Sequence, residues 1–199
     1  MSFQFRPKTT FICVLFALLC IRLAYWQWER HLEKKIVIRT LHERLKQAVF
    51  PFSEISNSKY FDWNSVVHRK FSVEGDFDYQ HEMVIKNRRY ETIAGAYILT
   101  PLKISNSDQY ILVQRGFIPL KESEKEVRKK YEVKNPVSFV GLLKESQKRK
   151  FLSPKDPESG KNFPWADSWL RVNIDEIQKQ LPYKVLPVFM EKMDKEGID

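Results

Sequence analysis

The chain has 199 residues, of which 43% are hydrophobic and 14% aromatic, and its formal net charge is +9. This length and composition suit one domain with an appendage and exclude global disorder, while the positive charge favours anionic partners without choosing among lipid headgroups, acidic proteins and nucleic acid. Both cysteines, Cys13 and Cys20, lie within the first twenty residues, so the rest of the chain can form neither a disulfide nor a thiolate zinc site.

Residues 9–28 read TTFICVLFALLCIRLAYWQW and contain a single charge, Arg22, near the far end. A helix of about 20 residues spans the hydrocarbon layer of a bilayer, and Tyr25, Trp26 and Trp28 suit its interface. We therefore predict a short head at 1–8 and a transmembrane helix at 9–28. A cleaved signal peptide is the alternative, but no small-x-small site follows the apolar run.

The residues around this apolar run bear on which membrane the helix crosses and in which orientation. The eight-residue head is too short for a mitochondrial transit peptide, which favours a bacterial membrane over an organelle. Basic residues lie on both sides of the span, with Arg6 and Lys8 before it and Arg30, Lys34 and Lys35 after it. The positive-inside count is therefore ambiguous, and it does not fix the orientation.

Helical periodicity continues beyond the span, because Leu32, Ile36, Leu41, Leu45 and Val49 recur at intervals of four or five residues. It predicts a juxtamembrane helix over 29–50 that stops before a proline. Packing of this helix on its own domain is the favoured interpretation, and a helix on the membrane surface is the alternative.

The periodicity then changes towards two, which is typical of strands. Arg88–Tyr90 are predicted as the basic tip of a hairpin, and Pro187 favours an edge position for the last strand. The chain from 51 to 199 is thus predicted as a β-rich domain, a mostly antiparallel barrel or sandwich with peripheral helices, in an α+β fold. The predicted strands cover 69–77, 82–87, 91–102, 110–119, 137–144, 168–174 and 183–190.

Two segments between strands have other patterns. Residues 121–133 place Glu124 with Arg128 and Glu126 with Lys130 at i,i+4, which predicts a solvated helix, with a protein-docking face as the alternative. Residues 146–165 are rich in proline, glycine, serine and lysine and are predicted to form a long loop.

Arg115 is the one charge on the apolar face of its strand, which it shares with Ile111 and Val113. A buried guanidinium needs a carboxylate partner, for which Asp76 or Asp78 is expected. A structural role in closing the barrel is favoured over partner binding.

The sequence shows little that would support catalysis. Its four histidines, among them His68 and His81, are scattered without the spacing of metal ligands, and the latter two are predicted as solvated strand-end residues. No glycine-rich phosphate loop or nucleophile motif is present. Lys148–Phe151 mixes basic and aromatic residues as a nucleic-acid groove would, but acidic residues are interleaved along most of the chain. We predict neither an enzyme nor a nucleic-acid partner.

Short motifs then follow one another in a specific order. Together they resemble the Surfeit locus 1 family of cytochrome c oxidase assembly factors over roughly residues 5–190. Each fragment is weak by itself, whereas the ordered set is specific. The motifs are Trp26-Gln27 with Arg30, Gly75-x-Phe77, Gly95 with Thr100-Pro101-Leu102, Arg115-Gly116-Phe117-Ile118-Pro119, Gly141-Leu142-Leu143, the loop residues Pro154, Asp156-Pro157 and Trp165, and Pro187-Val188-Phe189.

The resemblance marks some of these positions as family-motif or partner-facing candidates. Gly75 and Gly116 have a physical interpretation as well, since we expect both at strand bends where a side chain would clash. The full set of candidates is Trp26, Gln27, Arg30, Gly75, Phe77, Arg115, Gly116, Pro119 and Trp165.

The resemblance implies an assembly factor in the bacterial cytoplasmic (inner) membrane, with the head at 1–8 cytoplasmic and the domain on the periplasmic or outer side. It would help deliver haem a to, or insert it into, subunit I of an aa3-type oxidase, with subunit I, other assembly factors and membrane lipids as partners. The family's proposed haem histidine lies on a second membrane helix. Here EKMDKEGID follows Met190, so either the sequence stops before that helix or this is a single-pass member, and no haem ligand is assigned. The alternative function is a membrane-tethered structural or anionic-lipid-binding module, suggested by the +9 charge beside an anchor.

Overall fold

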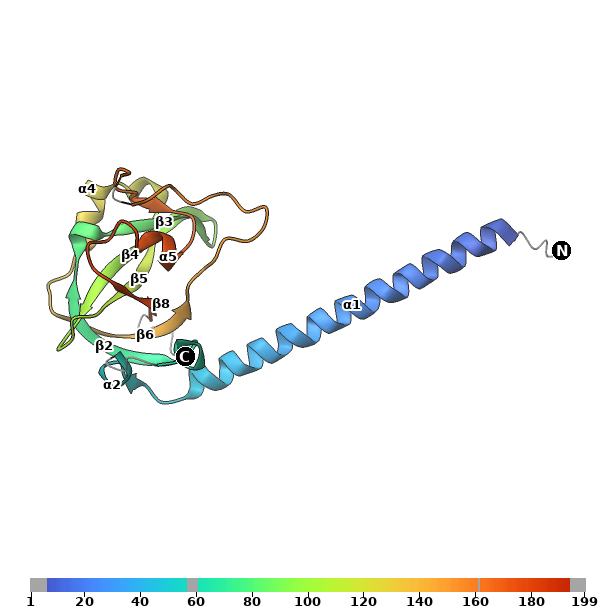
Figure 1. The fold of residues 1–199 in the computed structure, drawn as a ribbon, viewed down its shortest axis with the longest axis horizontal. Helices are drawn as coiled ribbons and strands as arrows, with labels where there is room; N and C mark the ends of the chain where they lie inside the picture. The colour runs from blue at the N-terminus through green and yellow to red at the C-terminus, as the bar shows by residue number, and fades with distance from the viewer. Residues whose placement is uncertain (1–6, 57–60, 161, 194–199) are drawn as a thin grey trace. The chain divides into compact units, whose positions relative to one another are not determined.

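The computed structural model describes residues 7–56, 61–160 and 162–193. The chain divides into two compact units, Met1–Lys46 and Gln47–Asp199. The first is dominated by one helix and the second by strands (Figure 1). Each unit is described by itself below.

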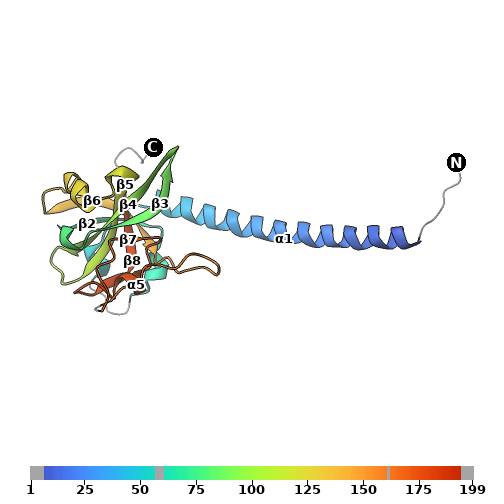
Figure 2. The same cartoon turned by 90° about the horizontal axis from the view of Figure 1, so that it is seen from above.

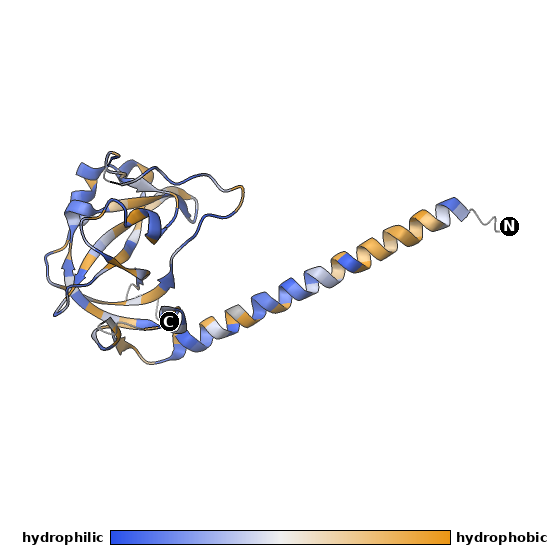
Figure 3. Ribbon diagram, in the orientation of Figure 1, coloured by the Kyte–Doolittle hydropathy of each residue, from blue (hydrophilic) through white to orange (hydrophobic). Residues whose placement is uncertain are grey.

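The first unit contains α1, a continuous helix from Pro7 to Lys46. At 1.5 Å per residue its 40 residues extend over about 60 Å. By length and composition α1 could cross a membrane, and the apolar residues are concentrated in its N-terminal half (Figure 3). Both segments predicted to be helical, 9–28 and 29–50, fall largely on this element, but the chain enters a strand at Phe50. The limits of the bilayer along α1 stay a prediction.

The described residues of the second unit form short helices and eight strands. The strands are β1 (Phe50–Pro51), β2 (Lys70–Phe77), β3 (Met83–Tyr90), β4 (Ile93–Ile104), β5 (Tyr110–Pro119), β6 (Val137–Glu145), β7 (Ser168–Trp169) and β8 (Val185–Lys192). The helices are α2 (Ser53–Ser56), α3 (Trp63–Val66), η1 (Tyr79–His81), η2 (Leu120–Glu122), α4 (Lys125–Arg128), η3 (Lys129–Tyr131) and α5 (Ile174–Ile177).

The strands form one sheet in the order β1-β2-β6-β8-β5-β4-β3-β7. An additional pairing of β2 with β4, in which Gly75 lies opposite Ile104 and Phe77 opposite Leu102, closes β2, β6, β8, β5 and β4 into a ring. The pairs β1–β2, β3–β7 and β5–β8 are parallel, and the others are antiparallel. The predicted α+β class with a mostly antiparallel barrel is therefore confirmed (Figures 1 and 2).

Alternation along the strands divides the apolar residues between the two faces of the sheet. One cluster draws buried residues from every strand of the ring, among them Phe71, Leu102, Val113, Leu143 and Met190, and it fills the barrel. Residues of β3, β4, β5 and β8 that point to the other face of the sheet form a second cluster. This cluster is covered by β7, α5 and the segments around them. The barrel wall is thus packed on both faces where these C-terminal segments lie.

Two details of the predicted strands are wrong. Arg88–Tyr90 belong to β3 and do not form the hairpin tip, because Tyr90 pairs with Ile93 and the turn falls at Glu91, whose φ is 51°. The segment predicted as a strand over 168–174 is extended only at β7 and enters α5 at Ile174.

The prediction that Pro187 marks an edge strand is also wrong, because β8 lies between β6 and β5. On the β5 side, Tyr110 pairs with Val185 and Leu112 with Phe189, so residues 186–188 form an irregularity in the ladder. On the β6 side, pairing extends from Val188 to Lys192. A proline lacks the backbone N–H that a regular ladder needs, so this irregularity makes an interior position possible.

Candidate functional site

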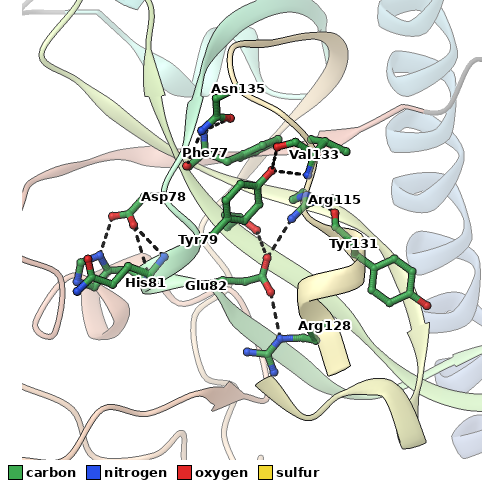
Figure 4. Close-up of polar contacts among 12 residues, drawn as sticks. Phe77, Asp78, Tyr79, His81, Glu82, Arg115, Arg128, Tyr131, Val133 and Asn135 are labelled. Carbon is green, nitrogen blue, oxygen red and sulfur yellow. Dashed lines mark hydrogen bonds and ion pairs between the residues drawn. The ribbon is translucent and has the colours of Figure 1, made fainter. Parts of the chain in front are cut away.

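The most densely connected polar group of the domain surrounds Glu82, which lies between η1 and β3 and is 5% exposed. Its carboxylate accepts hydrogen bonds from Thr100 Oγ1 at 3.0 Å, Arg115 Nη1 at 3.0 Å and Arg128 Nε at 3.1 Å. Arg128 is 1% exposed and makes a second, bidentate pair with Asp167, at 3.0 and 2.6 Å. Figure 4 shows the contacts of Glu82 with the two arginines. Four charges of balanced sign therefore connect β4, β5, α4 and the segment before β7.

Arg115 reaches Glu82 because of a bulge in β5. Gly116 pairs with Ile98 and Gln114 with Leu99, so Arg115 is an extra residue between two adjacent ladder positions. A bulge redirects the side chain of its extra residue. The guanidinium lies over the rings of Phe77 and Tyr79, 4.9 and 5.1 Å from their centroids, and also donates to the carbonyl of Tyr131.

The predictions for Arg115 are thus partly correct. It does lie at the apolar interior face and is largely buried, with its side chain 9% exposed. Its carboxylate partner is Glu82 and neither Asp76 nor Asp78. Asp78 instead caps η1, since its Oδ1 accepts from the backbone N–H groups of Gln80 and His81.

The segment 121–133 is not the solvated helix that its charge spacing predicts. It breaks into η2, α4 and η3, and Arg128 points to Glu82 and Asp167 in place of Glu124. Glu126 pairs with Lys129 at 2.6 Å, and Lys130 pairs with Glu122 at 2.9 Å. Burying Arg128 against two carboxylates outweighs the small gain from exposed i,i+4 pairs.

A second cluster surrounds Asp78. Its Oδ2 is 2.6 Å from His81 Nδ1 and accepts from the hydroxyl of Tyr183. The His81 ring makes edge contacts with Trp165 and Tyr183, at centroid distances of 5.3 and 5.8 Å, and Tyr110 stacks on Tyr183. His81, with 21% of its side chain exposed, is therefore half-buried, contrary to its prediction as a solvated strand-end residue.

Between the two clusters, residues 133–135 are fastened to the end of β2. The side chain of Asn135 accepts from Phe77 N at 3.0 Å and donates to Phe77 O at 3.1 Å. The hydroxyl of Tyr79 donates to Val133 O at 2.8 Å and accepts from Val133 N at 2.9 Å (Figure 4). These four hydrogen bonds hold residues 133–135 against the end of β2.

The electrostatics fit a brace better than a reacting centre. Burial alone raises the pKa of Asp78, but the hydrogen bonds from Tyr183 and His81 and the His81 charge outweigh it and lower the pKa. Burial and the neighbouring Asp78 raise the pKa of Tyr183 far above its ordinary value, so this phenol is a poor nucleophile. The arrangement positions segments and leaves no activated nucleophile among these groups.

The remaining candidates fall in several places. Trp26, Gln27 and Arg30 lie on α1, where the Arg30 guanidinium is 5.5 Å from the centroid of the Trp26 ring. Pro119 ends β5 and pairs with Gly95. In the body, the structure brings together Phe77 and Arg115, while Trp165 contacts the neighbouring cluster through His81.

The two glycines of the motif set differ. A Cβ on Gly75 would lie 2.1 Å from the carbonyl oxygen of Lys103, so the β2–β4 closure requires glycine there. At Gly116 nothing lies within 4 Å of such a Cβ. The expected clash is thus present at Gly75 and absent at Gly116, where the neighbouring bulge leaves open space.

Sequence reasoning did not single out Glu82, Asp167 or Tyr183, and it assigned Arg128 to an exposed pair with Glu124. No alternation marks Glu82, because Met83, Val84 and Ile85 after it are all apolar and all buried. No local pattern marks the contact of Arg128 with Asp167 either.

Comparison of the sequence with known proteins identifies the family. A family model described as "SURF1 family" matches residues 14–198. The chain belongs to the SURF1 family. The match includes most of the predicted span, the barrel and both polar clusters, and it bears out the resemblance drawn from the ordered motifs.

Individual members of the family are similar to this chain with modest pairwise sequence identity. Surfeit locus protein 1 of Rattus norvegicus is 29% identical over 176 residues, which cover 79% of this chain and 53% of the rat protein. The human protein of the same name is 26% identical and covers 74% and 53%. The SURF1-like protein of the bacterium Rickettsia bellii is 23% identical and covers 87% and 66%. The chain spans about half the length of the mammalian relatives it matches.

Proposed function

We propose that this chain is a membrane-anchored assembly factor for an aa3-type cytochrome c oxidase, and that it assists haem a delivery to, or insertion into, subunit I. The observation that carries the proposal is the family match over residues 14–198. SURF1 proteins are known as oxidase assembly factors and do not form a classical enzyme family. This supports a role without catalysis of its own.

The geometry supports a positioning role. Paired charges around Glu82 and the two hydrogen bonds between Asn135 and Phe77 hold several segments together at one end of the barrel, which suits a surface that contacts a partner. Tethering by α1 raises the effective concentration of that surface beside a membrane-embedded partner, and a weak contact then suffices. Subunit I and other assembly factors are the proposed partners, at the bacterial cytoplasmic membrane with the barrel on the periplasmic or outer side.

Deletion of the gene tests the role in oxidase assembly. We expect the strain to lose most aa3 activity and membrane haem a, and the full-length chain to restore both. A chain in which residues 9–28 are replaced by an unrelated membrane helix separates tethering from contact, since restoration would mean that the span only anchors. Glu126→Gln, at an exposed ion pair, is the matched control and should restore fully. Normal activity and haem a content in the deletion strain would overturn the proposal.

The proposed role in haem a delivery needs a separate measurement. The full chain is purified after co-expression with haem a synthesis, and its reduced-minus-oxidised spectrum is recorded. A haem a spectrum that His31→Ala removes would place a ligand on α1. If no haem co-purifies while the deletion strain still lacks oxidase, the chain assists assembly without carrying haem.

A further inference from the structure

Among the described residues of the barrel unit, the two most exposed large apolar side chains lie at the tip of one loop. Phe151 is 93% exposed and Leu152 is 86% exposed. They belong to the loop that follows β6, which extends away from the strands in both views of the fold (Figures 1 and 2). Leaving two such neighbours in water is unfavourable, and adjacent exposed apolar residues often mark an interaction site.

The tip is an ordered turn. Ser153 N donates to the carbonyl of Lys150 at 3.1 Å, and Arg149 Nε donates to the carbonyl of Ser153 at 2.9 Å. Leu152 has a φ of 68°, in the region that favours glycine and that a bulky residue seldom adopts. The chain therefore keeps a large apolar side chain at the position where glycine would be easiest.

The base of the loop is fastened to the barrel unit. Gln147 exchanges two hydrogen bonds with the backbone of Val172, at 2.8 and 3.1 Å. On the other side of the tip, Arg171 donates to the carbonyl of Pro154 at 2.8 Å and pairs with Asp156 at 2.6 Å. Phe151 and Leu152 therefore project from a supported turn.

A basic hollow of about 460 Å³ lies at the base of this tip. Its lining includes the cationic residues Arg88, Lys148, Lys150 and Arg171. Asp156 compensates the charge of Arg171, but within the described ranges 7–56, 61–160 and 162–193 the structure gives the other three no carboxylate partner. The hollow thus has an excess of positive charge beside two exposed apolar residues.

An apolar tip with a cationic base matches the boundary layer of an anionic bilayer. Aromatic and aliphatic side chains enter the headgroup and acyl boundary while lysine and arginine attract phosphate groups. A nucleic-acid groove would use the cations and the aromatic ring but has no use for Leu152. The chain also contains a helix, α1, that is long and apolar enough to cross a membrane, and such an anchor makes a bilayer an available partner.

We propose that residues 147–154 form a membrane-docking loop. Phe151 and Leu152 insert at the bilayer interface, and the hollow lined by Arg88, Lys148 and Lys150 takes the phosphate of an anionic lipid. The inference rests on the membrane anchoring in the proposed function and not on the oxidase role, so its test contains no oxidase.

The test uses the full chain in nanodiscs of phosphatidylcholine with and without phosphatidylglycerol. In a Cys13→Ala, Cys20→Ala background, Leu152→Cys is labelled with an environment-sensitive fluorophore. We expect a blue shift and quenching by spin-labelled lipid in the anionic discs, and a loss of this response in Lys148→Gln, Lys150→Gln. The same label at Leu120→Cys, a 54% exposed residue of η2, should report water in both discs.

All of the substituted side chains are exposed, so the variants should fold, and circular dichroism checks that each one does. Loss of membrane contact can then be distinguished from loss of folding. An aqueous signal from position 152 in both discs overturns the inference. So does an equal lipid response from position 120, which would indicate non-specific contact. A label that responds to single-stranded RNA but to neither disc would assign the loop to nucleic acid and overturn it as well.

Discussion

The Glu82 cluster and the loop of residues 147–154 are both rich in arginine or lysine, but they use positive charge differently. Arg115 and Arg128 have side chains 9% and 1% exposed, and both contact Glu82. Lys148 and Lys150 are exposed and line a hollow. Neither lysine has a carboxylate partner among the described residues. The net charge of +9 therefore says little until each cation is assigned to one of these environments.

The difference teaches where the chain depends on its charges. A buried guanidinium is stable only with its carboxylates, so removing one partner leaves an uncompensated charge in a poorly solvated position. An exposed ammonium is solvated by water, and its removal costs little stability. Mutations in the first region should affect folding, and mutations in the second should affect binding.

The largest effect is expected at Glu82. Glu82→Ala leaves Arg115 and Arg128 without their common acceptor, and we expect a loss of about 3–5 kcal/mol in the free energy of unfolding. Urea denaturation of the detergent-solubilised chain, followed by near-UV circular dichroism, measures it. Lys148→Gln, Lys150→Gln is the matched control and should unfold at the wild-type urea concentration. Equal midpoints for the two variants would remove the distinction between the regions.

The closure of the barrel provides the second test. Gly75→Ala places a methyl group 2.1 Å from the Lys103 carbonyl oxygen, so the β2–β4 pairing must shift, at a cost of about 1–3 kcal/mol. Gly116→Ala enters open space and should be near neutral. Thermal unfolding of both variants compares them, and a neutral Gly75→Ala would show that this closure is easily deformed.

Acid should weaken the Asp78 cluster. Because the folded-state pKa of Asp78 is lowered, its contribution is fully present above the unfolded pKa of about 3.9 and is lost as the pH falls through the folded value. At neutral pH, Asp78→Asn removes charge-assisted hydrogen bonds, with a cost of about 1.5 kcal/mol. The wild-type and variant stabilities should then converge at strongly acidic pH. A constant difference down to that pH would contradict the assignment.

The smallest change in stability is expected at the loop tip, where the substitution should stabilise the chain, unlike the substitutions above. Leu152→Gly relieves a residue at φ 68° and removes no buried contact, so stability should rise by about 1 kcal/mol. Calorimetry measures the change, with Phe151→Ser as a control that leaves this backbone conformation unchanged. A loss of stability would mean that Leu152 packs against the domain.

Much of the fold could be predicted because its signals are local. The predicted strand over 110–119 coincides with β5, and that over 137–144 lies within β6. The described part of 146–165 contains no helix or strand, as its composition predicts. Alternation and turn residues depend only on neighbours along the chain, so the sequence contains them directly.

The errors arise where distant segments meet. Pro187 is tolerated inside the sheet because the β5–β8 ladder is irregular there, and Arg128 leaves the expected exposed pairing for partners 46 and 39 positions away. Neither partner lies within the window that a periodicity covers. Arg115 shows the same limit, since the sequence predicts its burial but its partner follows from a bulge.

By itself, the sequence determined an apolar helical segment, a β-rich domain, a long basic loop and the ordered motifs of the family, because each depends on residue types at short spacing. Only the tertiary structure decided which cations are paired with carboxylates and which stay exposed to solvent. That choice depends on strand register, the bulge at Arg115 and the closure at Gly75, which together place Glu82 between two arginines and leave Lys148 and Lys150 in solvent.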